Sequence, residues 1–278
     1  MTTWELTVLV CMGSFVAGLL GSLTGLGGGG LIVPFLVLGF GVDIRYAMGA
    51  SLISVIATSS GAAAAYVKEG FSNIRIGMFL EIATAAGAVL GASSVLRLPT
   101  ADIAIVFGVV LMVSAILSAI QTDDVPLDAT PDRLAHILRL DSTYPTTTGL
   151  QSYSAHRVPA GFGVMFGAGI LSGLLGIGSG AFKVLAMDHV MRLPFKVSAT
   201  TSNFMIGVTA VASAGIYLRQ GFVAPGLAMP VVLGTLLGSV TGTRALLRAR
   251  TEWLRVVFGI VIAVLGIEMI YSGFTGRL

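Results

Sequence analysis

Two charged side chains stand inside apolar stretches of this 278-residue chain, where charges are costly. Lys183 lies near the start of the short apolar segment 179–191, and Glu81 lies well inside the longer segment 74–96. An ammonium at the centre of a bilayer costs about 2.5–3.5 kcal/mol on insertion scales, and an anionic ligand offsets that cost. We therefore predict that Lys183 binds an anion, the alternative being a lysine that snorkels to the membrane surface. Glu81 is a candidate proton carrier, with a counter-ion to Lys183 or a headgroup-level residue as alternatives.

Glycines precede Lys183 and recur earlier in the chain. Gly25-Leu26-Gly27-Gly28-Gly29-Gly30 opens one short apolar segment, and Gly176-Ile177-Gly178-Ser179-Gly180 opens the other. The first run matches G-x-G-x-x-G, but it follows an apolar helix instead of a strand, so it does not indicate a dinucleotide site. A glycine break does expose backbone N–H groups at the start of the next helix, where the helix dipole favours an anion.

We expect the two glycine-led helix starts to face one another and to hold one anion near the middle of the membrane. The residues expected to form this site are Gly27, Gly28, Gly29, Gly30, Gly178, Ser179, Gly180 and Lys183. The alternative is that the glycines only let helices pack closely. A ligand role predicts that valine at Gly28 or Gly29 abolishes function, whereas alanine at Gly108 is tolerated.

Small polar side chains in two further apolar segments supply hydrogen-bond donors. They are Ser51, Ser54, Ser202 and Asn203. Hydroxyl and amide groups can donate to the oxygens of an anion, and the Asn203 amide offers two donors. Alternatively, these residues hold neighbouring helices together. Three other polar residues lie near segment ends, where we expect solvated positions: Asp188, His189 and Glu268.

These features occur twice because the first 120 residues align, without a gap, with the chain 151 positions further on. The offset pairs Tyr66 with Tyr217 and the dipeptide Gly70-Phe71 with Gly221-Phe222. The copies differ in chemistry, since Lys183 aligns with Ile32 and Glu81 aligns with Val232. Duplicated halves with glycine-broken apolar segments are typical of secondary transporters.

The composition indicates a membrane protein. The chain is 55% hydrophobic and 10% charged, with a mean hydropathy of +0.94. Apolar runs that approach the ~20 residues of a spanning helix are 6–23, 47–67, 74–96, 101–120, 158–175, 198–218, 223–245 and 253–271. Runs 28–40 and 179–191 are shorter. The sequence therefore predicts an all-α polytopic fold of two repeats, each with one helix, a short glycine-led segment and three full spans.

Charge and cysteine content exclude other classes of protein. A net charge of +3 reflects membrane orientation and does not indicate nucleic-acid binding. One cysteine, Cys11, permits neither an internal disulfide nor a metal cluster of thiolates. We expect no cofactor and no metal. The expected partners are a small anionic substrate and the lipid bilayer, and the oligomeric state stays open.

Positive charges orient the chain. If the second repeat is inverted relative to the first, eleven of the fifteen lysines and arginines other than Lys183 lie on one face, whereas parallel repeats divide them eight to seven. We expect a first membrane repeat, 1–120, a cytoplasmic polar linker, 121–157, and a second membrane repeat, 158–278. Both termini then face outward. The linker carries one short helix signal, with Thr130 as its N-cap and Pro131 in its first turn.

The glycine clusters, the Tyr-to-Phe loop pattern and the repeat with its polar linker resemble the sulfite exporter TauE/SafE family. This resemblance covers nearly all of the chain outside the linker. It implies a multi-pass protein of a bacterial inner membrane that moves sulfite, an organosulfonate or another small anion. The second copy departs from the first, with Ser179 and Ala181 at the positions of Gly28 and Gly30.

The resemblance and the residues together predict a non-enzymatic exporter of a small anion that works by alternating access. An inside-negative potential drives each exported negative charge by about 2.3 kcal/mol per 100 mV, so export needs no coupling ion. One alternative is a proton-coupled importer of a small organic anion. Another is a membrane-embedded enzyme, although no histidine, acid and nucleophile occur at a catalytic spacing.

Overall fold

The computed structural model describes residues 3–24, 28–68, 72–119, 132–146, 149–178, 180–246 and 251–276. The first half contains α1 (Thr3–Thr24), α2 (Gly29–Phe40), α3 (Ile44–Lys68), α4 (Ile74–Ser94), the 3-10 turn η1 (Val95–Arg97) and α5 (Thr100–Ala119). The second contains α7 (Val158–Leu175), α8 (Gly180–Leu185), the π-helical turn η2 (Ala186–Val190), α9 (Phe195–Arg219), α10 (Pro225–Leu246) and α11 (Thr251–Thr275). Between them lie α6 (Arg133–Ile137), β1 (Ser142–Thr146) and β2 (Gly149–Tyr153).

The prediction of an all-α polytopic membrane protein is confirmed. Each of the eight long apolar runs forms a helix. Five helical stretches in the described part of the chain are long and apolar enough to cross a membrane: Trp4–Gly21, Ile74–Arg97, Val158–Leu175, Phe195–Arg219 and Pro225–Gly242. Large apolar side chains such as Met12, Ile82 and Leu237 are more than half exposed, as expected for helix faces that contact lipid.

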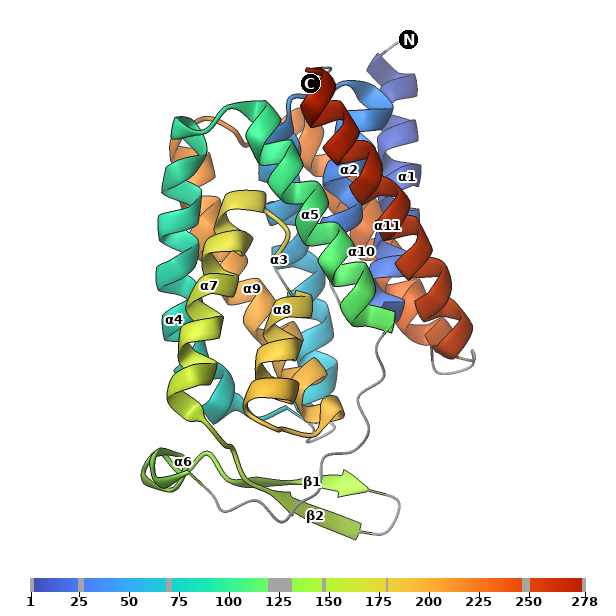
Figure 1. Cartoon of the computed structure of the whole chain (residues 1–278). Coiled ribbons are helices and arrows are strands. Elements are labelled where there is room, and N and C mark those ends of the chain that lie inside the picture. Colours follow the sequence, from blue (N-terminus) through green and yellow to red (C-terminus); the bar gives the residue numbers. More distant parts are fainter. Residues whose placement is uncertain are drawn as a thin grey trace.

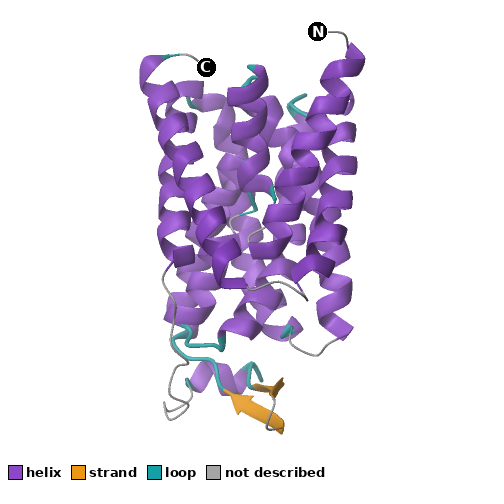
Figure 2. Ribbon diagram, turned by 90° about the vertical axis from the view of Figure 1, so that its right-hand side faces the viewer, coloured by secondary structure: helices purple, strands orange, loops and turns teal. Residues whose placement is uncertain are grey.

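The helices form one bundle with the linker at one end (Figure 1). Both termini lie at the opposite end, so α1 begins at the far end from the linker whereas α7 begins beside it. α7 and α8 together return the chain to the linker end of the bundle. This is shown by a hydrogen bond between the residues on either side of them, in which the N–H of His156, before α7, donates to the carbonyl of Met191, after η2, at 3.0 Å. The loop between α7 and α8 lies about halfway along the bundle (Figure 2).

Glycines bring the helices of the bundle into close contact. A Cβ on Gly169 of α7 would lie 2.2 Å from the Thr84 carbonyl oxygen of α4, and a Cβ on Gly18 of α1 would lie 2.4 Å from the Thr235 carbonyl of α10. These two contacts are 151 residues apart in sequence and join equivalent helices, since α4 packs on α7 and α10 packs on α1. Alanine at Gly108 would place its Cβ 2.5 Å from the Gly266 carbonyl oxygen, so α5 and α11 would have to shift, which argues against the tolerance expected from the sequence.

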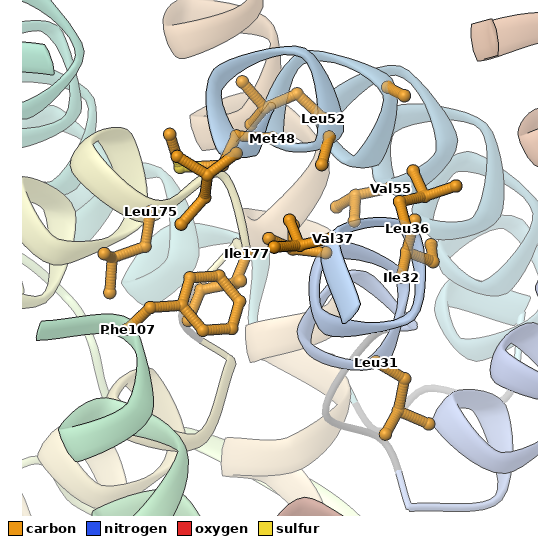
Figure 3. Packing of buried hydrophobic residues seen from close by; sticks show 14 of the residues in the cluster. Leu31, Ile32, Leu36, Val37, Met48, Leu52, Val55, Phe107, Leu175 and Ile177 are labelled. Carbon is orange, nitrogen blue, oxygen red and sulfur yellow. The ribbon is translucent and has the colours of Figure 1, made fainter. Parts of the chain in front are cut away.

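A core of buried apolar side chains lies in the middle of the bundle (Figure 3). Ile32 and Leu36 of α2, Leu52 of α3 and Phe107 of α5 are fully or almost fully buried there, beside Ile177 between α7 and α8. A second buried cluster joins the helices to the linker through residues such as Tyr153 and Met191. The short helices α2 and α8 therefore run through protein rather than lipid, which explains why they need not span a bilayer.

The linker is more ordered than the sequence predicted. It contains the antiparallel hairpin of β1 and β2 as well as α6, and no strand was expected. Asp132 caps α6, since its carboxylate accepts from the Leu134 N–H at 3.4 Å and from the Val158 N–H at 3.1 Å. The expected cap, Thr130 with Pro131, lies outside the described residues.

Asn73, the residue before α4, attaches the linker to the bundle. Its side-chain amide donates to the Tyr153 hydroxyl at 2.9 Å and to the Leu140 carbonyl at 3.1 Å, while its carbonyl oxygen accepts from the Ile76 N–H. Its backbone N–H donates to the Thr201 hydroxyl of α9 at 3.0 Å. Burial raises the pKa of the Tyr153 phenol above its ordinary value.

Candidate functional site

Glycine conformations create the break from which the candidate site is built. Gly176 ends α7 with φ 66°, and Gly178 follows with φ 73°. Both angles lie in the left-handed region, which costs a residue with a Cβ roughly 1–2 kcal/mol. The chain therefore leaves α7 and restarts as α8 at Gly180, which brings Lys183 into the interior of the bundle.

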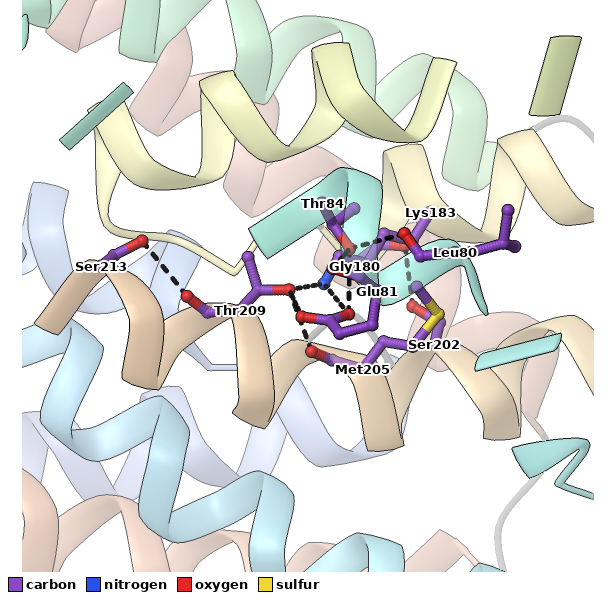
Figure 4. A network of polar contacts seen from close by, with 9 residues as sticks. All are labelled: Leu80, Glu81, Thr84, Gly180, Lys183, Ser202, Met205, Thr209 and Ser213. Carbon is purple, nitrogen blue, oxygen red and sulfur yellow. Dashed lines mark hydrogen bonds and ion pairs between the residues drawn. The ribbon is translucent and has the colours of Figure 1, made fainter. Parts of the chain in front are cut away.

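Lys183 is completely buried, and its ammonium faces Glu81 (Figure 4). The Nζ atom lies 3.8 Å from Glu81 Oε2 and donates a hydrogen bond to the Thr209 hydroxyl. Glu81 itself is only 6% exposed. Two alternatives are therefore wrong: Lys183 does not snorkel to a surface, and Glu81 does not lie at headgroup level. The counter-ion relationship between the two residues is confirmed.

Two threonines complete the hydrogen bonds of the carboxylate. The Thr209 hydroxyl donates to Glu81 Oε1 at 2.6 Å, and the Thr84 hydroxyl lies 3.0 Å from Oε2. Thr84 follows Glu81 by three residues on α4 and so shares its face of the helix. The network joins α4 of the first half to α8 and α9 of the second, because Lys183 and Thr209 come from those two helices.

The two glycine-led segments meet, as predicted. A Cβ on Gly29 would lie 3.3 Å from the Ile177 Cα, so the backbones of the two breaks are in contact. The Ser51 hydroxyl lies 2.9 Å from the Gly176 carbonyl and 3.3 Å from the Gly29 carbonyl, within reach of both breaks. Ser202 makes the equivalent contact in the second half and donates to the Gly180 carbonyl at 3.2 Å.

The remaining predicted residues contribute less to this geometry. Gly28 precedes α2 in ordinary helical conformation, and Gly30 is half-buried on its first turn. Ser54 donates to the Ser51 carbonyl of its own helix, and Asn203 is half-buried. Gly27 and Ser179 lie outside the described residues. Both Ser51 and Ser202 use their hydroxyls to hold backbone carbonyls, as the helix-packing alternative predicted for them.

Sequence reasoning missed Thr84 and misplaced Asp188. Threonine is common in membrane helices, but its position three residues after an intramembrane acid is a usable signal. Asp188 is 3% exposed in the π-helical turn η2 instead of solvated, with His189 Nδ1 3.6 Å from its Oδ2. Among the described residues no three His, Cys, Asp or Glu side chains gather as a metal site.

Comparison with known proteins agrees with this architecture. The model of the sulfite exporter TauE/SafE family matches residues 10–269. The chain belongs to this family. It is 28% identical to the probable membrane transporter protein YunE of Bacillus subtilis strain 168 over 273 residues, covering 96% of this chain and 97% of that protein.

Two further relatives carry similar names. The probable membrane transporter protein YdhB of the same Bacillus strain is 27% identical, with 85% of this chain and 89% of YdhB covered. The probable membrane transporter protein MJ0441 of Methanocaldococcus jannaschii is 24% identical, with 95% of each chain covered. No solved structure matches the chain.

Proposed function

We propose that this TauE/SafE protein carries a small anion across the membrane by alternating access. One observation carries the proposal: a fully buried ammonium, that of Lys183, lies on a short helix whose glycine-led start follows directly from the meeting point of the two breaks. A buried cation with hydrogen-bond donors around it suits an anion that arrives from water and leaves again.

The substrate we propose is sulfite, an organosulfonate or a related sulfur-containing anion, in agreement with the name of the family. The oxygens of such an anion accept hydrogen bonds, and the Lys183 ammonium supplies N–H donors and charge. The further donors that we propose are the first backbone N–H groups of α8 and the side-chain amide of Asn203, since the Ser202 hydroxyl donates to the Gly180 carbonyl. The rest of the proposed anion site would be formed by the glycine-led segments, through Gly27, Gly28, Gly29, Gly30, Gly178 and Ser179.

Alternating access follows from two repeats of opposite orientation. The supporting observations are the opposite starting ends of α1 and α7 and the equivalent contacts of Ser51 with Gly29 and of Ser202 with Gly180. Halves related in this way can exchange conformations and so open the same central site to either side of the membrane. The boundaries we propose for the repeats remain 1–120 and 158–278, with the linker between them.

The orientation we propose puts the linker in the cytoplasm and both termini outside a bacterial inner membrane, with export as the direction of transport. Positive charges favour this arrangement. Single cysteines at the exposed positions Ser152 and Thr275, in a Cys11→Ser background, test it with an impermeant maleimide on intact cells. Labelling at position 275 alone is expected, and labelling at position 152 alone contradicts the orientation.

Flux measurements test the function itself. The purified protein is reconstituted into liposomes loaded with radiolabelled sulfite, sulfoacetate, thiosulfate or acetate. We expect efflux of at least one sulfur-containing anion well above that from protein-free liposomes, and slower efflux of acetate. The absence of protein-dependent flux for all four anions contradicts the proposed function.

A further inference from the structure

The ion pair between Lys183 and Glu81 is not closed by a direct hydrogen bond. A bonded ammonium and carboxylate lie about 2.7–2.9 Å apart, whereas Lys183 Nζ and Glu81 Oε2 are 3.8 Å apart. The Thr209 hydroxyl links them instead, since it accepts from Nζ and donates to Oε1. The charges attract one another, yet the ammonium and the carboxylate can separate without breaking a bond between them.

The hydrogen bonds of Lys183 and of Glu81 would both allow an external anion to take the place of the Glu81 carboxylate beside the ammonium. An ammonium has three N–H donors, and among the described residues Thr209 is the hydrogen-bond partner found for Lys183 Nζ. Within the described part of the chain, two donors of the ammonium are therefore left that can bind the oxygens of an anion. The Glu81 carboxylate accepts from Thr84 and Thr209 without needing the lysine. Glu81 thus acts as the internal anion of a site that an external anion can enter.

Charge balance restricts what happens when an external anion binds. The empty pair is neutral, and an added monoanion would give this buried site a net negative charge, which costs several kcal/mol in a low-dielectric interior. The titratable groups of the packed elements α4, α5, α7, α8, α9 and η2, apart from the pair itself, are Arg75, Asp102, Asp188, His189, Lys196, Tyr217 and Arg219. Arg75, Lys196 and Arg219 lie at helix ends, and α7 has no titratable residue.

We propose that the transported anion displaces the Glu81 carboxylate from Lys183 and that Glu81 takes up one proton in the same step. This inference rests on the proposed function. One anion and one proton enter the site, an O–H bond forms on the Glu81 carboxylate, and Lys183 stays an ammonium paired with the new anion. The empty and loaded sites are then both neutral for a monoanion, so both can pass through the occluded state of an alternating-access cycle.

This exchange changes the driving force expected from the sequence. Movement of a monoanion with one proton transfers no charge, so the membrane potential does not drive it. The anion and pH gradients set the direction, and a difference of one pH unit balances an anion gradient of about tenfold. Export of a monoanion against an acidic exterior then requires accumulation of that anion inside.

Infrared difference spectroscopy on the wild-type protein in bilayers tests the proton uptake directly. The probe is sodium methanesulfonate, a monoanion that does not itself titrate near neutral pH, and calorimetry on the same sample records its binding. We expect the C=O stretch of a protonated carboxylic acid to appear on addition of the anion, together with uptake of about one proton from a weak buffer. Glu81→Gln should lose both signals, and the matched control Glu268→Gln, at an exposed acid of α11, should keep them.

The outcomes separate this inference from the proposed function. Methanesulfonate binding without a carboxylic acid band and without proton uptake overturns the exchange while leaving anion transport intact. A band that persists in Glu81→Gln also overturns it, because another acid is then protonated. Failure of methanesulfonate and of sulfite to bind at all contradicts the proposed function itself.

Discussion

Around Lys183 the bundle holds an ion pair and two threonines, Thr84 and Thr209, whereas the equivalent place around Ile32 has apolar residues at both charged positions. Lys183 aligns with Ile32, and Glu81 aligns with Val232. The threonines are present in both places, but Thr58 and Thr235 bond only to carbonyls of their own helices. The backbone contacts recur while the charges do not.

This comparison shows that the two halves share backbone contacts but differ in their charged side chains. Ser51 with Gly29 and Ser202 with Gly180 show that the same hydroxyl-to-carbonyl contact recurs at equivalent positions in both halves. A second charged pair would cost desolvation twice and would place two like-charged ammonium groups in one bundle. We interpret the place around Ile32 and Val232 as the uncharged structural counterpart of the site around Lys183 and Glu81.

The largest effect should follow removal of one charge only. Lys183→Gln leaves the Glu81 carboxylate without its cation and is expected to lower stability by about 3–5 kcal/mol at a pH where Glu81 is ionised. Thermal unfolding in detergent measures the effect. The double variant Glu81→Gln/Lys183→Gln should recover most of the loss, and a double variant as unstable as the single contradicts a neutralising pair.

Glycine substitutions test whether the scaffold is the same in both halves. Gly169→Ala and Gly18→Ala should each destabilise the protein by about 1–3 kcal/mol, because the added methyl group overlaps the carbonyls of Thr84 and Thr235. Gly167→Ala is the control, since a Cβ there meets nothing within 4 Å. Midpoints of thermal unfolding compare all three variants. A large loss for Gly169→Ala with none for Gly18→Ala would show that the two halves pack differently.

Loss of a bridging hydroxyl should matter in one half only. Thr209→Val removes the group between Lys183 and Glu81 and is expected to cost about 1–3 kcal/mol, because Lys183 loses its hydrogen-bond acceptor and Glu81 loses one of its two hydroxyl donors. Thr58→Val, at the equivalent position, removes bonds to its own helix alone and should cost less than about 0.5 kcal/mol. Chemical unfolding of the two variants measures the loss in free energy of unfolding for each. Equal losses would contradict the proposed chemical difference between the two equivalent places.

The smallest effect is expected in the linker, which is remote from the surroundings of both Lys183 and Ile32. Tyr153→Phe removes the acceptor of the Asn73 amide and should cost about 1 kcal/mol. The pKa of Tyr153 is raised from 10.0 by burial, so the stability it contributes is present below pH 10 and is lost as the pH rises through the higher folded value. Limited proteolysis of the linker between pH 9 and 11 should accelerate in the wild type and depend less on pH in Tyr153→Phe.

Long elements were predictable from the sequence because their signals are local. Runs of apolar residues defined the eight long helices, and the glycine clusters located the two breaks. The pairing of Glu81 with Lys183 was one alternative among several, since the two residues are about a hundred positions apart and only the packing of α4 against α8 and α9 brings them together. The hairpin of β1 and β2 was missed because its threonine- and serine-rich strands lack an apolar alternation.

Anion binding to the charged pair is the central claim, and isothermal calorimetry with sulfite and methanesulfonate tests it most directly. The comparison uses the wild type, Glu81→Gln/Lys183→Gln and Thr58→Val, all confirmed as folded by their thermal unfolding. We expect the double variant to bind at least tenfold more weakly than the wild type, and Thr58→Val to bind normally. Unchanged affinity in the folded double variant would contradict the account and exclude Lys183 from the site.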